Sequence, residues 1–86
     1  MTLIELITEQ AARLKKAGVS FGHGTGNAFD EAAWLVLWAL DMPLDALEDH
    51  AQNQPDAASI AKAKALIARR IESRVPAAYL TREAWL

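Results

Sequence analysis

Apolar residues recur three and four positions apart near the start of the chain, as on one face of an amphipathic helix. These positions are Leu3, Ile4, Ile7, Ala11 and Leu14. Thr2 and Glu5 have the spacing of a capping box, in which each side chain accepts a hydrogen bond from the other residue's backbone amide. Gly18 can adopt the left-handed conformation that ends a helix. The pattern predicts a helix between Thr2 and Gly18.

A second helical run is apolar on all sides from Ala32 to Leu40, which is typical of a helix at the centre of a bundle. Asn27 can cap its start. Asp30 and Glu31 place negative charge in its first turn, where the helix dipole favours it. The sequence therefore predicts a central helix from Asn27 to about Asp41.

Each of the three prolines precedes a further stretch of good helix formers, and proline is tolerated in a first helical turn. We expect a short helix over Leu44–His50, a long one over Asp56–Arg74 and a single turn over Pro76–Leu80. The long helix aligns Ile60, Ala63, Ile67 and Ile71. No stretch alternates apolar and polar residues for long enough to form a strand. The predicted fold class is all-α, a small bundle of four to five helices.

Length and composition narrow the class of protein. A chain of 86 residues forms one small domain. Its net charge of -2 argues against strong nucleic-acid binding. The longest apolar run is about half of what a bilayer-spanning helix needs, and the N-terminus lacks the basic region of a secretory signal. Because the chain has no cysteine, disulfides and thiolate zinc sites are excluded, which fits a cytoplasmic protein. The short apolar run leads us to expect no membrane partner.

The segment Gly22-His23-Gly24-Thr25-Gly26 is the one concentrated glycine pattern, and we interpret it as a loop. No strand precedes it and no lysine follows it, so an irregular connector explains it better than a phosphate cradle. A protein-recognition loop remains an open alternative. With His23 and His50 as the only histidines, we expect no metal site and no catalytic base.

Trp34 and Trp38 lie four apart and share one helix face with Glu31 and Asp41. The opposite stripe is apolar and contains Phe29, Ala33, Val36, Leu37 and Leu40. The tryptophan face is therefore a candidate surface for a partner, and burial of both rings in the core is the alternative. The basic residues of the long helix are interpreted as a solvated face; they are Lys62, Lys64, Arg69, Arg70 and Arg74.

Two stretches carry a family resemblance. The first is Phe21-Gly22-His23-Gly24-Thr25 with Asn27 and Asp30-Glu31-Ala32, and the second runs from Arg70 through Val75-Pro76-Ala77-Ala78-Tyr79-Leu80-Thr81 to Glu83-Ala84-Trp85. They resemble the N-terminal region of the HemK-like protein-glutamine methyltransferases, in the PrmB branch. The resemblance implies a substrate-recognition bundle followed by a linker and a Rossmann-like domain, which binds S-adenosylmethionine and carries an Asn-Pro-Pro-Tyr motif.

Neither that motif nor a glycine-rich cofactor motif occurs in the chain. We therefore expect residues 1–80 to be the bundle and residues 81–86 to begin the linker to an absent catalytic domain. The full-length parent would use S-adenosylmethionine, whereas this chain would bind no cofactor and be inactive alone. The implied partners are its own catalytic domain and a large-subunit ribosomal protein, or a peptide chain release factor in the sister branch.

The candidate contacts to the substrate or to the catalytic domain combine both motif blocks with the tryptophan face. They are Gly22, His23, Gly24, Thr25, Asn27, Trp34, Trp38, Tyr79 and Thr81. No catalytic, cofactor-binding or metal-binding residue is expected among the 86. The alternative function is an independent helical protein-interaction module, which could be dimeric and would have no enzymatic role.

Overall fold

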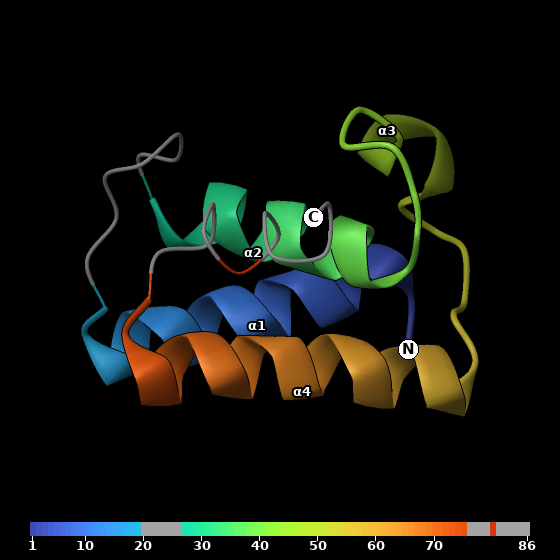
Figure 1. The fold of residues 1–86 in the computed structure, drawn as a ribbon. Helices are drawn as coiled ribbons and strands as arrows, with labels where there is room; N and C mark the ends of the chain where they lie inside the picture. The colour runs from blue at the N-terminus through green and yellow to red at the C-terminus, as the bar shows by residue number, and fades with distance from the viewer. Residues whose placement is uncertain (20–26, 76–79, 81–86) are drawn as a thin grey trace.

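Helices account for the regular structure of the described part of the chain, residues 1–19, 27–75 and 80, in a computed structural model (Figure 1). Helix α1 spans Leu3–Ala17, α2 spans Ala28–Ala39, α3 spans Leu47–His50 and α4 spans Ala57–Ser73. Helices α1, α2 and α4 pack on one another, and the short α3 contacts α1. The all-α prediction is confirmed. No helix within the described ranges is both long and apolar enough to cross a membrane.

The long helices begin and end at residues that the sequence marks. The amide of Thr2 donates to Glu5 Oε1 at 2.8 Å and the amide of Glu5 donates to Thr2 Oγ1 at 3.2 Å, which completes the predicted capping box. Gly18 ends α1 with a φ of +68°, a conformation that glycine adopts without a steric penalty. Asp56 caps α4 by accepting from the amide of Ser59 at 2.7 Å.

One buried cluster joins the three long helices. Its members are Leu3, Leu6, Ile7 and Leu14 of α1, Ala32, Leu35, Val36, Leu37 and Ala39 of α2, Ala63 and Ile67 of α4, and Val19. Because α2 contributes the largest share and packs against both α1 and α4, its prediction as the central helix is confirmed. Ile60 and Ile71 are half-buried at the margin of this cluster.

The first amides of α1 have partners outside the helix. The amide of Leu3 donates to the carbonyl of Asn53 at 2.8 Å, and that of Ile4 donates to the carbonyl of Ala51 at 2.9 Å. The first four amides of a helix have no partner within it, so the connector between α3 and α4 satisfies two of them. The start of α1 is thereby tied to a segment about fifty residues away in the sequence.

Three sequence predictions about these elements are corrected or left outside the described part. The short helix begins at Leu47 and not at Leu44, because the amide of Ala46 donates to the carbonyl of Pro43 and closes a turn first. Phe29, predicted on the buried stripe of α2, is 39% exposed. Of the predicted helical turn over Pro76–Leu80, only Leu80 is described, and it is buried.

Two capping carboxylates make stability depend on pH. Hydrogen bonds from the backbone and side chain of Thr2 lower the pKa of Glu5, and those from Ser59 lower the pKa of Asp56. A carboxyl group with a lowered pKa in the folded state stabilises the fold above its unfolded pKa. This contribution is lost as the pH falls from about 4.5 through the lowered values.

We expect the double variant Glu5→Gln, Asp56→Asn to flatten the acid limb of the stability profile, the range below about pH 4.5 in which the free energy of unfolding falls with decreasing pH. Both caps keep an acceptor oxygen, so the fold at pH 7 is retained, while the titrating groups are gone. The free energy of unfolding, measured by urea titration between pH 3 and pH 7, tests this. The control is Glu72→Gln, which replaces an exposed carboxylate of α4. An acid limb as steep as that of the wild type would contradict the assignment.

Candidate recognition surface

Of the candidate contact residues, the structure describes Asn27, Trp34 and Trp38, which lie at the start of α2 or along it. Asn27 Oδ1 accepts from the amide of Asp30 at 2.8 Å, and Asn27 Nδ2 donates to Asp30 Oδ2 at 3.2 Å. These bonds engage the Asn27 side chain in starting the helix. Its presence in the motif is therefore explained by folding, in agreement with the predicted cap.

The two tryptophans are both half-buried, so neither the fully exposed nor the fully buried interpretation describes them. Trp34 packs against the buried cluster. Trp38 lines an open hollow between α2 and α4 with a volume of about 220 Å³. The structure therefore separates the pair: Trp34 belongs to the margin of the core, and Trp38 offers part of its ring to a surface hollow.

The hollow beside Trp38 combines an apolar floor with positive charge. Its other lining residues are Ala39 of α2 and Lys62, Ala65, Leu66 and Arg69 of α4. Lys62 Nζ lies 4.0 Å from Asp41 Oδ2, and both side chains are largely exposed, so this ion pair is weak. The hollow can accept an apolar side chain next to a negatively charged or carbonyl group.

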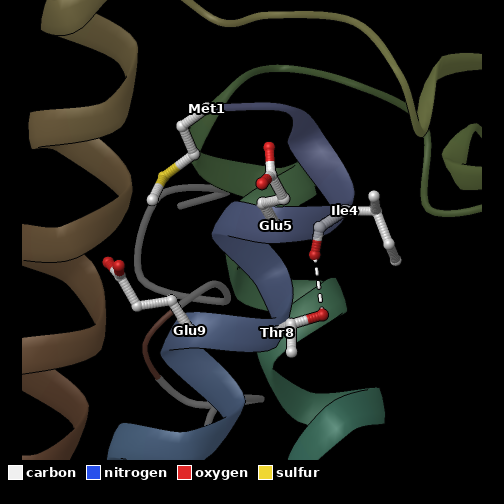
Figure 2. Close-up of a pocket in the computed structure, with 5 residues that line it drawn as sticks. All are labelled: Met1, Ile4, Glu5, Thr8 and Glu9. Carbon is white, nitrogen blue, oxygen red and sulfur yellow. Dashed lines mark hydrogen bonds between the residues drawn. The ribbon is translucent and has the colours of Figure 1, made fainter.

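A second hollow, of about 400 Å³, lies along the outer face of α1 (Figure 2). Figure 2 shows Glu5 and Glu9 on successive turns, with Met1, Ile4 and Thr8 around them. The chain itself engages the polar groups, since Thr8 Oγ1 donates to the carbonyl of Ile4 at 2.8 Å and Glu5 belongs to the capping box. Glu9 Oε1 lies 3.5 Å from Lys64 Nζ. This arrangement brings no nucleophile and base together.

A buried ion pair joins α2 to α4. Arg70 Nε donates to Glu31 Oε2 at 3.0 Å, and the two side chains are 2% and 3% exposed. The predictions that Glu31 lies on an accessible face and Arg70 on a solvated one are wrong. Arg70 lies three positions after Ile67 and seven after Ala63, hence on the buried stripe of α4, and a charge on such a stripe requires a partner.

A second arginine, Arg74 at the end of α4, contacts the end of α1. Arg74 Nη1 donates to the carbonyl of Ala17 at 3.0 Å. In Figure 1, α1 and α4 end on the same side of the molecule as α2 begins. The remaining candidate residues lie outside the described part and stay predictions; they are Gly22, His23, Gly24, Thr25, Tyr79 and Thr81.

No group of three or more metal-ligating side chains occurs in residues 1–19, 27–75 and 80. Those residues also leave no buried side-chain nitrogen or oxygen without a hydrogen-bond partner.

Comparison with known proteins gives consistent matches. The family model described as the PrmC N-terminal domain matches residues 5–81. Over 99% of its length the chain is 49% identical to a ribosomal protein uL3 glutamine methyltransferase of Burkholderia pseudomallei. It is 45% and 42% identical, over 98% of its length, to proteins of the same name from Xanthomonas campestris and Neisseria meningitidis. The chain spans 27–28% of these relatives. No solved structure matches.

Proposed function

Because this chain belongs to the PrmC N-terminal domain family, we propose that it recognises the substrate of an S-adenosylmethionine-dependent protein-glutamine methyltransferase. The proposed substrate is the large-subunit ribosomal protein uL3. The observation that carries this proposal is the 49% identity, over almost the whole chain, to an enzyme named for that reaction. Such an enzyme would act in the cytoplasm, where it meets ribosomal proteins.

We assign residues 1–80 to the recognition bundle and residues 81–86 to the beginning of a linker. The bundle offers hollows and helix ends, and two of the charged side chains at the hollows, Glu9 and Lys62, are paired with Lys64 and Asp41. Methyl transfer to an amide nitrogen requires that the amide and the methyl donor are aligned. Residues beyond this chain would hold both groups, while the bundle would hold the rest of the substrate protein.

A methyl-transfer assay tests this division of labour. The full-length protein, given labelled S-adenosylmethionine, is expected to methylate a glutamine of uL3 and to leave a release factor unmodified. The isolated 86-residue chain is expected to transfer no methyl group and to give no binding heat with S-adenosylmethionine. Micromolar cofactor binding by the isolated chain would overturn the domain assignment. An inactive full-length protein would favour an independent interaction module.

Within the bundle, we propose that the glycine-rich segment and Trp38 contact the substrate protein. Trp38 lines a hollow with an apolar floor, and tryptophan is enriched among residues that dominate binding energy. In the full-length protein, Trp38→Ala and His23→Ala are expected to raise the KM for uL3 about 10-fold. The KM for S-adenosylmethionine should stay unchanged.

The control is Leu44→Ala, which removes a large apolar side chain that is 57% exposed and does not line this hollow. It should leave both KM values unchanged. Trp34→Ala should mainly lower stability, since Trp34 packs on the buried cluster. Unchanged methylation kinetics in both Trp38→Ala and His23→Ala would remove this surface from consideration.

A further inference from the structure

Three helix ends meet on one side of the bundle, and each is held there by a specific contact (Figure 1). Val19, just beyond the end of α1, is 6% exposed and belongs to the buried cluster. The start of α2 is anchored by the ion pair of Glu31 with Arg70, one turn before the end of α4. Arg74 then joins the end of α4 to the carbonyl of Ala17.

The direction in which the chain leaves α4 is fixed by three constraints. Arg74 has a φ of +59°, which turns the backbone sharply at the end of the helix. The amide of Val75 donates to Ser73 Oγ at 3.2 Å. Val75 also precedes Pro76, and a residue before proline is confined to extended conformations. The exit from the helix is therefore a defined turn.

The backbone of Arg74 is in a conformation that L-residues with a Cβ adopt at a cost, and glycine is the usual residue at such a helix end. A glycine could not bind the carbonyl of Ala17. The guanidinium places positive charge at the C-terminus of α1, where the helix dipole favours it, and it occupies a carbonyl that the helix leaves unpaired. The side chain thus supplies a contact between two helices in addition to ending one.

We propose that Arg74 is a positioning residue, which holds the chain leaving α4 against the C-terminus of α1 and so sets the angle between the bundle and a catalytic domain attached to its C-terminal end. The inference rests on the proposed function, since it matters for catalysis only if the bundle binds substrate for such a domain. A substrate held at one site and modified at another reacts at an effective concentration that depends on the connection between them. Misplacement by about 1 Å can lower a rate about 100-fold.

The test compares Arg74→Gly and Arg74→Lys in the full-length protein. Arg74→Gly relieves the left-handed conformation while it removes the hydrogen bond, so the midpoint of thermal unfolding should stay close to that of the wild type. The kcat/KM for uL3 should fall about 10-fold or more, whereas transfer to a glutamine peptide too short to reach the bundle should not change. Arg74→Lys keeps a charged donor and should recover part of the activity.

Asp41→Gly is the matched control for the change in backbone conformation. Among the described residues, Asp41 and Arg74 are the two that are not glycine and have a positive φ, and the φ of Asp41 is +57°. Asp41 lies after the opposite end of α2, so Asp41→Gly should leave hydrogen exchange at Val75 unchanged. Because Asp41 lies 4.0 Å from Lys62 at the hollow beside Trp38, the control for uL3 methylation is Leu44→Ala, which should leave methylation unchanged. If Arg74→Gly leaves uL3 methylation unchanged, or lowers uL3 and peptide methylation equally, the proposal is wrong.

A wild-type protein that does not methylate uL3 would refute the proposed function alone. Hydrogen exchange at the amides of Val75 and Leu80 then tests whether Arg74 holds the chain that leaves α4. Faster exchange in Arg74→Gly than in the wild type and Asp41→Gly would support it, and equal exchange would overturn it.

Discussion

Replacing Arg70 with alanine is expected to lower the free energy of unfolding by about 3–5 kcal/mol. The substitution removes the guanidinium that neutralises Glu31 at 3.0 Å, while the carboxylate stays on the buried side of α2. A domain of this size has a total stability of about 4–13 kcal/mol, so the variant should be partly unfolded at room temperature. Urea titration followed by tryptophan fluorescence measures the loss.

The comparison that isolates the ion pair is a double variant, Glu31→Met with Arg70→Met. Apolar replacement of both partners at similar volume is often neutral or stabilising, so the double variant should be more stable than either single one. Lys64→Ala, which breaks the half-exposed contact with Glu9, should cost less than about 1 kcal/mol. Losses that simply add in the double variant would show that Glu31 and Arg70 contribute independently.

Leu37→Ala is expected to destabilise the bundle by about 2–5 kcal/mol, the second large effect. Leu37 is 1% exposed and lies in the cluster shared by α1, α2 and α4, so truncation leaves a cavity that the helices can close only in part. Leu40→Ala should cost less, because Leu40 is half-buried just after the end of α2. Denaturant titration of both variants measures the difference.

Leu44→Ala serves as the surface control, with an expected change within about 0.5 kcal/mol. If Leu37→Ala lost less than about 1 kcal/mol, α2 would not be the central helix. The stripe seen in the sequence ranked Leu37 and Leu40 equally, and the structure separates them because α2 ends at Ala39.

Sequence reasoning succeeded where the determining interactions are local. The predicted caps at Thr2 and Asn27 each bond a residue three positions away, so a short window contains all the information. Gly18 at the end of α1 is equally local. The family resemblance, which rests on two short motifs, is confirmed by the family match over residues 5–81.

Contacts between distant residues were not predicted. Arg70 and Glu31 are 39 positions apart, and Arg74 and Ala17 are 57 apart. Periodicity assigns residues to helix faces but does not say which faces meet. Because α2 is apolar nearly all round, its pattern gave little basis for choosing its buried side. Phe29 was therefore placed on the buried side although it is exposed, and Glu31 on the accessible side although it is buried.

The candidate surface stays a prediction. Trp38 lines a hollow and Trp34 packs half-buried against the core cluster, a difference that the pattern did not give, because α2 packs between α1 and α4, which lie far apart in the sequence. Asn27 carries a capping role that a motif alone does not distinguish from a contact to substrate. The candidate residues outside the described part remain predictions.

The hydrogen bonds from the start of α1 to Ala51 and Asn53 limit where this domain can change in length. An inserted or deleted residue between Ala51 and Asn53 would move one carbonyl away from its amide and leave the first turn of α1 unsatisfied. The turn at Leu44 and Asp45 is exposed, so extra residues there would project into solvent. That turn also provides no acceptor for Leu3 or Ile4 at the start of α1, whose amides bind carbonyls of the connector. Natural variants that differ in length, and engineered insertions such as a fluorescent label, should therefore be accommodated at the turn before α3 and rejected in the connector after it.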